Sequence, residues 1–193
     1  MATPTQGRTR PEIVARGVHA GVDTLAAGRH PLGMDPAVIV RPARRDELPQ
    51  LGELAARLVR FHHAIDPLRF ILVEGVAEGY TRWFGKELDN PQAVLLTAVE
   101  GEGPLLGYAY GRLEARDWNL LLDRHAALHD ILVCESARGR SVGKGLLAAF
   151  CAEMKARGAP RVVLHTATSN TTAQGLFRAA GFRPTMVEMT LEL

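Results

Sequence analysis

The chain has 193 residues, of which 47% are apolar and 23% are charged, and its formal net charge is +2. This length and composition suit one compact α/β domain, or one domain with an appendage. The charge is small and the basic residues are spread along the chain, which argues against nucleic acid or a membrane surface as the main partner.

Cysteine usage and the lack of long apolar runs indicate a cytoplasmic protein. Two cysteines are present, Cys134 and Cys151, without Cys-x-x-Cys spacing, and this is typical of free thiols in a reducing compartment. No apolar run approaches the ~20 residues that span a bilayer. The first residues, Met-Ala-Thr-Pro-Thr-Gln-Gly, lack the apolar core of a signal peptide.

Residues 1–37 differ from the rest of the chain because they are rich in Gly, Pro, Arg and Thr. Their longest potential helix, from Ile13 to Leu25, is interrupted by Gly17 and Gly21. Three interpretations remain open for this segment: a weakly structured arm, a docking helix that supports a homodimer, and an organelle transit peptide. We expect the main domain to span residues 38–193.

The first half of this domain predicts a strand, two helices and a hairpin. Val38–Val40 is expected to be the strand, followed by a helix with Asp46 as N-cap and Pro49 in its first turn. Both helices are marked by apolar residues at helical spacing. These are Leu51, Leu54, Leu58 and Phe61 in the first helix, and Val76, Tyr80, Trp83 and Phe84 in the second. The hairpin strands are expected at Ala93–Glu100 and Leu105–Leu113, joined by a Gly- and Pro-containing turn.

The second half begins with a polar segment, Glu114–Ala127, which we interpret as a long loop. A buried strand is then predicted at Ile131–Val133. Two helices and two further strands follow from the apolar spacing. These are a helix through Leu146, Leu147, Phe150 and Met154, a strand at Arg161–Thr168, a short helix through Ala173, Leu176, Phe177 and Ala180, and an alternating last strand at Met186–Leu193.

The most informative stretch joins the buried strand at Ile131–Val133 to the helix that follows it. Its sequence is Cys134-Glu-Ser-Ala-Arg-Gly-Arg-Ser-Val-Gly-Lys-Gly145. Exposed amides at a helix N-terminus, with the helix dipole behind them, bind anions. Arg138, Arg140 and Lys144 add cationic donors, so this loop is a candidate diphosphate site. A tight turn with solvated arginines is the alternative.

Other phosphate-binding motifs do not fit this spacing. A P-loop requires four residues between its glycines and then Lys-Ser/Thr, whereas Gly139 and Gly143 are separated by three residues and Gly145 follows Lys144. The dinucleotide fingerprint Gly-x-Gly-x-x-Gly is absent, and no run of βαβ units surrounds the loop.

The loop resembles motif A of the GNAT N-acetyltransferase superfamily. That motif is a strand ending in Val, about four residues, and then Arg/Gln-x-x-Gly-x-Gly/Ala entering a helix. Counting from Val133 places the motif on Arg138-Gly139-Arg140-Ser141-Val142-Gly143, with Ser141 in place of the first glycine. A literal match also occurs two residues later, from Arg140 to Gly145. We prefer the first register because its distance from the strand is right.

A second segment, residues 170–182, resembles motif B of the same superfamily. That motif reads Asn-x-x-Ala-x-x-Leu-Tyr-x-x-x-Gly-Phe, and here Asn170, Ala173, Leu176, Gly181 and Phe182 match it in order. Phe177 stands where the motif has Tyr. The two motifs lie about 30 residues apart, as the family requires, and the resemblance covers the chain from about Val38 to Leu193.

The resemblance implies an α/β (α+β) fold, with a mixed, mostly antiparallel sheet of about six to seven strands flanked by four helices. It also implies acetyl-CoA as co-substrate. The strand residues Ile131, Leu132 and Val133 would separate from the next strand and pair with the pantetheine arm. Asn170 and Phe177 would lie near the pantetheine and thioester. For Asn170, a role as helix N-cap is the alternative, and both roles are compatible. The pyrophosphate would be held by the loop residues Arg138, Gly139, Arg140, Ser141, Val142, Gly143 and Lys144.

A catalytic base is needed because an amine of pKa ~10.4 is almost wholly protonated at pH 7. The candidates lie at the ends of the buried strand: His129, Asp130 and Glu135. Strand alternation would put His129 and Asp130 on opposite faces of the sheet. Each of these residues could instead have a purely structural role.

The motif B tyrosine is commonly assigned to protonate the departing CoA thiolate. Phe177 has no proton to give, so this role cannot be carried over. No metal site is expected, because His125 and His129 lack a third ligand nearby.

The acceptor is expected to be a small-molecule or peptide amine. Substrate choice should reside in two segments that precede motif A: the two helices, with Phe61, His62, Tyr80 and Trp83, and the loop with Glu114, Arg116, Asp117 and Trp118. These residues could form an aromatic cleft, or could be core aromatics and a solvated loop. The predicted function is acyl transfer from acetyl-CoA to a primary amine by direct attack. The alternatives are a non-catalytic acyl-CoA-binding module and a protein N-terminal or lysine acetyltransferase.

Overall fold

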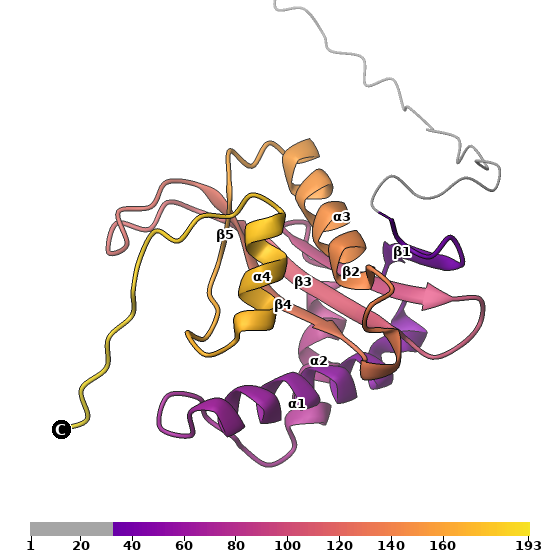
Figure 1. Ribbon diagram of the computed structural model, residues 1–193, viewed down its shortest axis with the longest axis horizontal. Coiled ribbons are helices and arrows are strands. Elements are labelled where there is room, and N and C mark those ends of the chain that lie inside the picture. Colours follow the sequence, from indigo (N-terminus) through magenta and orange to yellow (C-terminus); the bar gives the residue numbers. More distant parts are fainter. Residues whose placement is uncertain (1–32) are drawn as a thin grey trace, which may run out of the picture.

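The computed structural model describes residues 33–193. Within this range one five-stranded sheet is covered by four α-helices, as Figure 1 shows. The strands are β1 Val38–Pro42, β2 Ala93–Glu100, β3 Gly107–Glu114, β4 His125–Val133 and β5 Val162–Leu164. The helices are α1 Leu48–Ile65, α2 Val76–Glu87, α3 Val142–Ala156 and α4 Thr171–Ala179, with short 3-10 turns at Arg45–Glu47 and Glu135–Ala137.

The sheet is mixed. Strands β1 to β4 pair with their neighbours in antiparallel fashion, whereas β4 and β5 are parallel. The predicted fold class, its mostly antiparallel sheet and its four helices are confirmed; the predicted six to seven strands are not, since five are found in residues 33–193.

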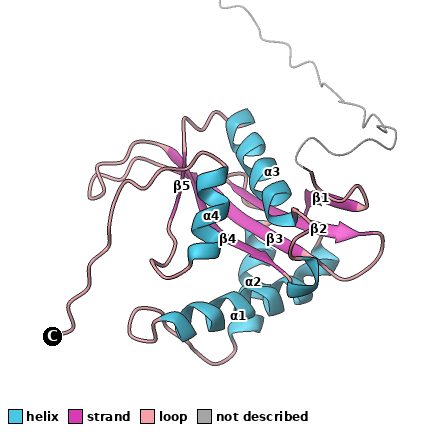
Figure 2. Ribbon diagram, viewed as in Figure 1, coloured by secondary structure: helices cyan, strands magenta, loops and turns pink. Residues whose placement is uncertain are grey.

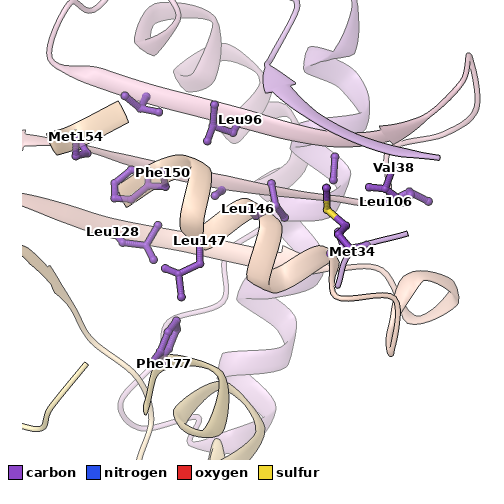
Figure 3. Packing of buried hydrophobic residues seen from close by; sticks show 14 of the residues in the cluster. Met34, Val38, Leu96, Leu106, Leu128, Leu146, Leu147, Phe150, Met154 and Phe177 are labelled. Atoms are coloured by element: carbon purple, nitrogen blue, oxygen red, sulfur yellow. The ribbon is translucent and has the colours of Figure 1, made fainter. Parts of the chain in front are cut away.

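Two helix layers enclose the sheet, with α3 and α4 on one face and α1 and α2 on the other (Figure 2). The first core lies under α3, where Leu146, Leu147, Phe150 and Met154 are almost wholly buried (Figure 3). These are the residues whose helical spacing predicted the helix. Phe177 of α4 belongs to the same core. The second core joins α1 and α2 to the aromatic side chains of β3.

Helices α1 and α2 pack closely because α1 carries a glycine where they meet. A Cβ atom at Gly52 would lie 2.4 Å from the backbone oxygen of Ala77 and 2.2 Å from the hydroxyl oxygen of Thr81. Such distances are far inside van der Waals contact, so only glycine allows this approach. The packing fixes where α2 places Tyr80 and Trp83.

Three predicted element bounds are wrong. The segment Met186–Leu193 alternates in sequence but pairs with no strand in the described part of the chain, and Met189 and Leu191 are exposed. Alternation shows that one face would suit burial, yet a strand also needs a sheet edge as partner. The strand expected over residues 161–168 is confined to β5, and β4 begins six residues earlier than predicted, at His125, inside the expected loop.

The start of α1 also differs from the prediction. Asp46 lies within the 3-10 turn, and no side chain caps the helix. Instead the Glu47 carboxylate accepts a hydrogen bond from the Arg44 amide at 2.8 Å and pairs with the Arg41 guanidinium. Pro49 does lie in the first turn, as predicted. The docking helix considered for Ile13–Leu25 lies outside the described residues.

Candidate active site

Strands β4 and β5 separate where the motif A strand approaches its loop. They pair only from Ala126 to Leu128 with Val162 to Leu164, although β4 continues to Val133. The segment Ile131–Val133 therefore has one edge paired with β3 and the other edge unpaired by any described strand. Buried backbone N–H and C=O groups require partners, so this edge suits an extended ligand with amide groups.

The turn from β4 into α3 exposes backbone amides. Helix α3 begins at Val142, so the amides of Val142, Gly143 and Lys144 have no acceptor within the helix. The helix continues to Ala156, and its dipole adds a partial positive charge at this end. Together these groups form a site suited to an anion.

Backbone conformation distinguishes the two possible registers of motif A. Ser141 has φ of 59° and lies in the left-handed region, which favours glycine. Gly143 lies inside α3 and is not among the residues with positive φ. The register that aligns Ser141 with the first glycine of the motif therefore fits the backbone, while the later register would place that glycine at a helical position.

The cations of this loop differ in how they are engaged. The Arg140 guanidinium is held by Asp35 at 2.7 Å and Glu100 at 2.9 Å, so its side chain is turned to two carboxylates. Arg138 is mostly exposed, with Glu135 at 3.8 Å. Lys144 is exposed and has no carboxylate within 4 Å among residues 33–193. Arg138 and Lys144 are thus the side chains that remain available to a phosphate.

Helix α4 is docked beside the start of α3. The Asn170 side-chain oxygen accepts a hydrogen bond from the Ala173 amide at 3.1 Å, so Asn170 is the N-cap of α4. Leu176 packs against α3 at Gly143, where a Cβ atom would lie 3.3 Å from the leucine methyl. Phe177 is buried in the core under α3 and lies against Phe182 in a tilted arrangement, with ring centres 5.9 Å apart, so its ring supports the site from within.

His129 and Asp130 lie on the same face of the sheet, contrary to the prediction from alternation. The β3–β4 register shifts there: Tyr110 is opposite Asp130 and Gly111 is opposite Leu128, which leaves His129 as the extra residue of a β-bulge. The His129 ring stacks on Tyr110, and Asp130 accepts a hydrogen bond from the Tyr108 hydroxyl at 3.2 Å. Both tyrosines belong to the core beneath α1 and α2.

The surroundings of Asp130 make its carboxylate more basic than an ordinary aspartate. Burial raises the pKa of Asp130 to about 6, and the hydrogen bond from Tyr108 offsets only part of this effect. Burial and the Asp130 charge raise the pKa of Tyr80 to about 12, and burial also raises the pKa of Tyr108. At neutral pH, Asp130 is therefore an ionised carboxylate with the basicity that a proton acceptor needs. The Tyr80 and Tyr108 phenols in its surroundings are neutral at this pH.

His129 and Glu135 are placed differently from Asp130. His129 lies 3.4 Å from Glu114, and burial lowers the pKa of its imidazole, so it is neutral at pH 7. Glu135 is exposed in the turn after β4, beside the loop that leads into α3. The structure therefore brings His129 and Asp130 together and leaves Glu135 apart from them.

Sequence reasoning missed Tyr108 and Tyr110 as neighbours of the candidate base. They lie two residues apart on β3, so they share one face, and this spacing was the available signal. Their role emerges only when β3 is paired with β4, which places Tyr108 against Asp130 and Tyr110 against His129.

A groove of about 790 Å³ opens between α1 and α2, and we call it the α1–α2 groove. Three residues expected at the acceptor cleft line it: His62, Tyr80 and Trp83. Phe61 and the loop with Trp118 do not. Trp118 is exposed beneath Arg116, whose guanidinium lies 5.0 Å from the indole ring centre. The loop with Trp118 is therefore a solvated surface loop, the second of the two possibilities considered from the sequence, and not a wall of the groove.

No helix among residues 33–193 is both long and apolar enough to cross a bilayer. In the same residues, no group of three or more His, Cys, Asp or Glu side chains is arranged to hold a metal ion.

Solved structures with the same fold include several acetyltransferases. The BH1408 protein from Bacillus halodurans, solved as a tetramutant, superposes with a TM-score of 0.70 at 18% identity, covering 80% of this chain and 99% of that one. The aminoglycoside N-acetyltransferase AAC(6')-Iy, bound to a bisubstrate analogue of CoA and acetylneamine, gives 0.62 at 19% identity, covering 81% and 97%. A predicted acetyltransferase from Clostridium acetobutylicum, solved with acetyl-CoA, gives 0.60 at 18% identity, covering 80% and 96%.

A search of curated proteins finds no match. The model of the acetyltransferase (GNAT) family matches residues 60–182, which is most of the chain and includes both motifs. The protein belongs to the GNAT family of acetyl-CoA-dependent acetyltransferases.

Proposed function

We propose that this protein transfers an acetyl group from acetyl-CoA to a primary amine of a small molecule, with direct attack of the amine in a ternary complex. The observation that carries the proposal is the position of Asp130. It lies on the part of β4 that β5 does not reach, three residues before the strand ends, and shares its surroundings with Tyr80 of the α1–α2 groove.

The separated strands and the loop divide the work of binding. The unpaired edge of Ile131–Val133 would hydrogen-bond the pantetheine amides. The amides of Val142, Gly143 and Lys144 would hold the pyrophosphate, with Arg138 as the exposed cation beside them. This arrangement would place the thioester near Asp130, between the loop and the groove.

The chemistry then requires one proton to be removed and one bond to be exchanged. Deprotonation of an alkyl ammonium costs about 4–5 kcal/mol at pH 7 without a base. Asp130 accepts that proton, directly or through a water molecule. The amine nitrogen forms a bond to the acyl carbon, and the carbon–sulfur bond breaks with its electron pair left on sulfur. The thiolate then takes a proton from water or from the newly formed ammonium group.

The direct test is amine-dependent release of CoA thiol from acetyl-CoA, screened against amines, amino acids, polyamines, aminoglycosides and peptides. Turnover with a small-molecule amine, and mass spectrometry of its monoacetylated product, would support the proposal. Release only with peptides or protein termini would move the acceptor to the protein class.

Phe177 gives a second candidate, a module that binds acyl-CoA without turnover, because it replaces the tyrosine to which the family assigns thiolate protonation. A thiolate with a pKa near ~8.5 is already a fair leaving group at pH 7, so we expect the wild-type protein to be active. Phe177→Tyr should raise kcat by less than about tenfold. It should also lower the melting temperature, because an unpaired buried hydroxyl costs about 1–3 kcal/mol. A silent wild type and an active Phe177→Tyr variant would establish the binding module instead.

A further inference from the structure

The α1–α2 groove has an apolar lining. Its side chains include Phe70, Ile71, Val73, Val76, Tyr80 and Trp83. Two of them are unusually exposed for their type, Ile71 at 79% and Val73 at 59%, so a ligand that covered them would remove apolar surface from water. The volume of about 790 Å³ lies within the range of about 300–1,000 Å³ typical of small-molecule sites.

The charged groups of the lining are few and nearly balanced. Within the described part of the chain, Glu74 is the only acidic lining residue, against Arg69 and Arg82. The Arg69 guanidinium is already held by both carboxylate oxygens of Glu188 and lies 5.1 Å from the Phe70 ring centre. Burial lowers the pKa of His62, so this residue adds no charge at pH 7. Among residues 33–193, the lining therefore carries one carboxylate, that of Glu74, and one guanidinium without a carboxylate partner within 4 Å, that of Arg82.

The groove reaches the candidate base through aromatic side chains. Tyr80 lines the groove and feels the Asp130 charge. Trp83 also lines it and packs edge-on against Tyr110, with ring centres 4.8 Å apart, and Tyr110 in turn stacks on His129. An acceptor whose body lay against Ile71 and Val73 would have its reacting end at the wall formed by Tyr80 and Trp83, behind which Asp130 and His129 lie.

We infer that the acceptor is a monoamine with an apolar alkyl or aromatic body, and not a polycation. The inference rests on the proposed function and narrows its substrate class. A polyamine or aminoglycoside would bring several ammonium groups to a lining with one carboxylate, and burying each unpaired charge is costly. The solved AAC(6')-Iy complex holds an aminoglycoside-derived analogue, so the two proteins would share a fold and differ in acceptor.

The test compares 2-phenylethylamine and hexylamine with spermidine and kanamycin in the thiol-release assay. We expect kcat/KM to be at least tenfold higher for the two monoamines. Ile71→Asp should lower kcat/KM for 2-phenylethylamine at least tenfold and raise that for spermidine. The matched control is Leu121→Asp, which changes a leucine of similar exposure, 85%, in the loop away from the groove, and should alter neither value. Higher kcat/KM for the polycations, or an equal effect of both variants, would overturn the inference.

A binding measurement separates this inference from the proposed function. The chain has two tryptophans, so Trp118→Phe leaves Trp83 as the one indole reporter in the groove. Quenching of its fluorescence by 2-phenylethylamine, without release of CoA, would keep the groove assignment and defeat the transferase proposal. Turnover with polycations alone would support the transferase proposal and defeat the groove assignment. If 2-phenylethylamine caused neither quenching of the fluorescence nor release of CoA, the groove assignment would be overturned.

Discussion

Asp130 owes its properties to a local irregularity of the sheet. The bulge at His129 turns Asp130 and His129 to the same face, where Tyr108 donates to the carboxylate. Period-two alternation cannot reveal a bulge, because the extra residue is visible only when the partner strand is aligned. Asp130 could be nominated as a candidate base from its place beside the predicted strand. The residues that surround it could not be predicted from the sequence.

Asp130→Asn should reduce kcat/KM by a hundredfold or more, the usual range for loss of a general base. The wild-type protein should lose activity as the pH falls through about 6, since the carboxyl must be ionised to accept a proton. Rates measured from pH 5 to 9 check this. The control is His129→Gln, whose pH–rate profile should still show the fall in activity, the acid limb, near pH 6. If that limb persisted in Asp130→Asn and vanished in His129→Gln, the imidazole would be the base.

The same pKa predicts how Asp130 affects stability. Its folded-state pKa of about 6 lies above the unfolded value of ~3.9, so the folded protein binds more protons between these values. The carboxyl therefore contributes stability at low pH that is lost as the pH rises through about 6. Asp130→Asn should leave the melting temperature at pH 7 unchanged or higher. A large drop, with activity retained at low temperature, would assign Asp130 to structure.

Ser141 carries the clearest backbone strain in the candidate phosphate loop, residues 138–144. A left-handed conformation costs a residue with a Cβ about 1–2 kcal/mol, and glycine avoids this cost. Glycine also gains about 0.5–1 kcal/mol of entropy in the unfolded chain, so Ser141→Gly should stabilise the protein by about 1 kcal/mol or less. A melting temperature up to about 4 °C higher is expected, with CoA affinity within threefold. Valine is β-branched, so Ser141→Val should lower both the stability of the protein and its affinity for CoA. A lower melting temperature in Ser141→Gly would contradict the strain assigned to Ser141.

At the scale of elements, helices with regular apolar spacing could be predicted from the sequence, whereas strands, which need a pairing partner, could be predicted less well. The apolar spacing from Leu146 to Met154 predicted α3, because those positions face one core. The segment Met186–Leu193 shows equally clear alternation but finds no strand to pair with in residues 33–193. Strand formation depends on a partner that local sequence does not contain.

The α1–α2 contact is the element-scale feature that positions the groove. Gly52→Ala would place a methyl group 2.4 Å from the Ala77 carbonyl oxygen and force the helices apart. Overpacking of this kind typically costs about 1–3 kcal/mol, so the melting temperature should fall by several degrees.

Gly175→Ala is the matched control for this prediction. It lies in α4, where a Cβ atom would meet nothing within 4 Å, so alanine should raise the melting temperature slightly. Thermal unfolding of both variants provides the measurement. Equal changes in melting temperature for the two variants would show that the close α1–α2 contact is not the reason that position 52 requires glycine.

At the scale of the whole molecule, two short motifs, in order, predicted the family and most of the architecture. The candidate phosphate loop could be nominated from sequence because its glycines, its cations and the helix that follows must be contiguous. The α1–α2 groove was only partly predicted, since its walls come from α1, α2 and the segment between them. The engagement of Arg140 by Asp35 and Glu100 was also hidden, because these partners lie 105 and 40 residues away.

Isothermal calorimetry with CoA tests most directly the proposal that the start of α3 holds the pyrophosphate of acyl-CoA. Replacing Arg138 and Lys144 together by Ala should raise the Kd at least tenfold without changing the fold, because charge-assisted hydrogen bonds contribute about 1.5–3 kcal/mol each. Replacing the distant, exposed Arg116 by Ala should leave the Kd unchanged. Equal CoA affinity in the double variant and the wild type would contradict the assignment of the phosphate site.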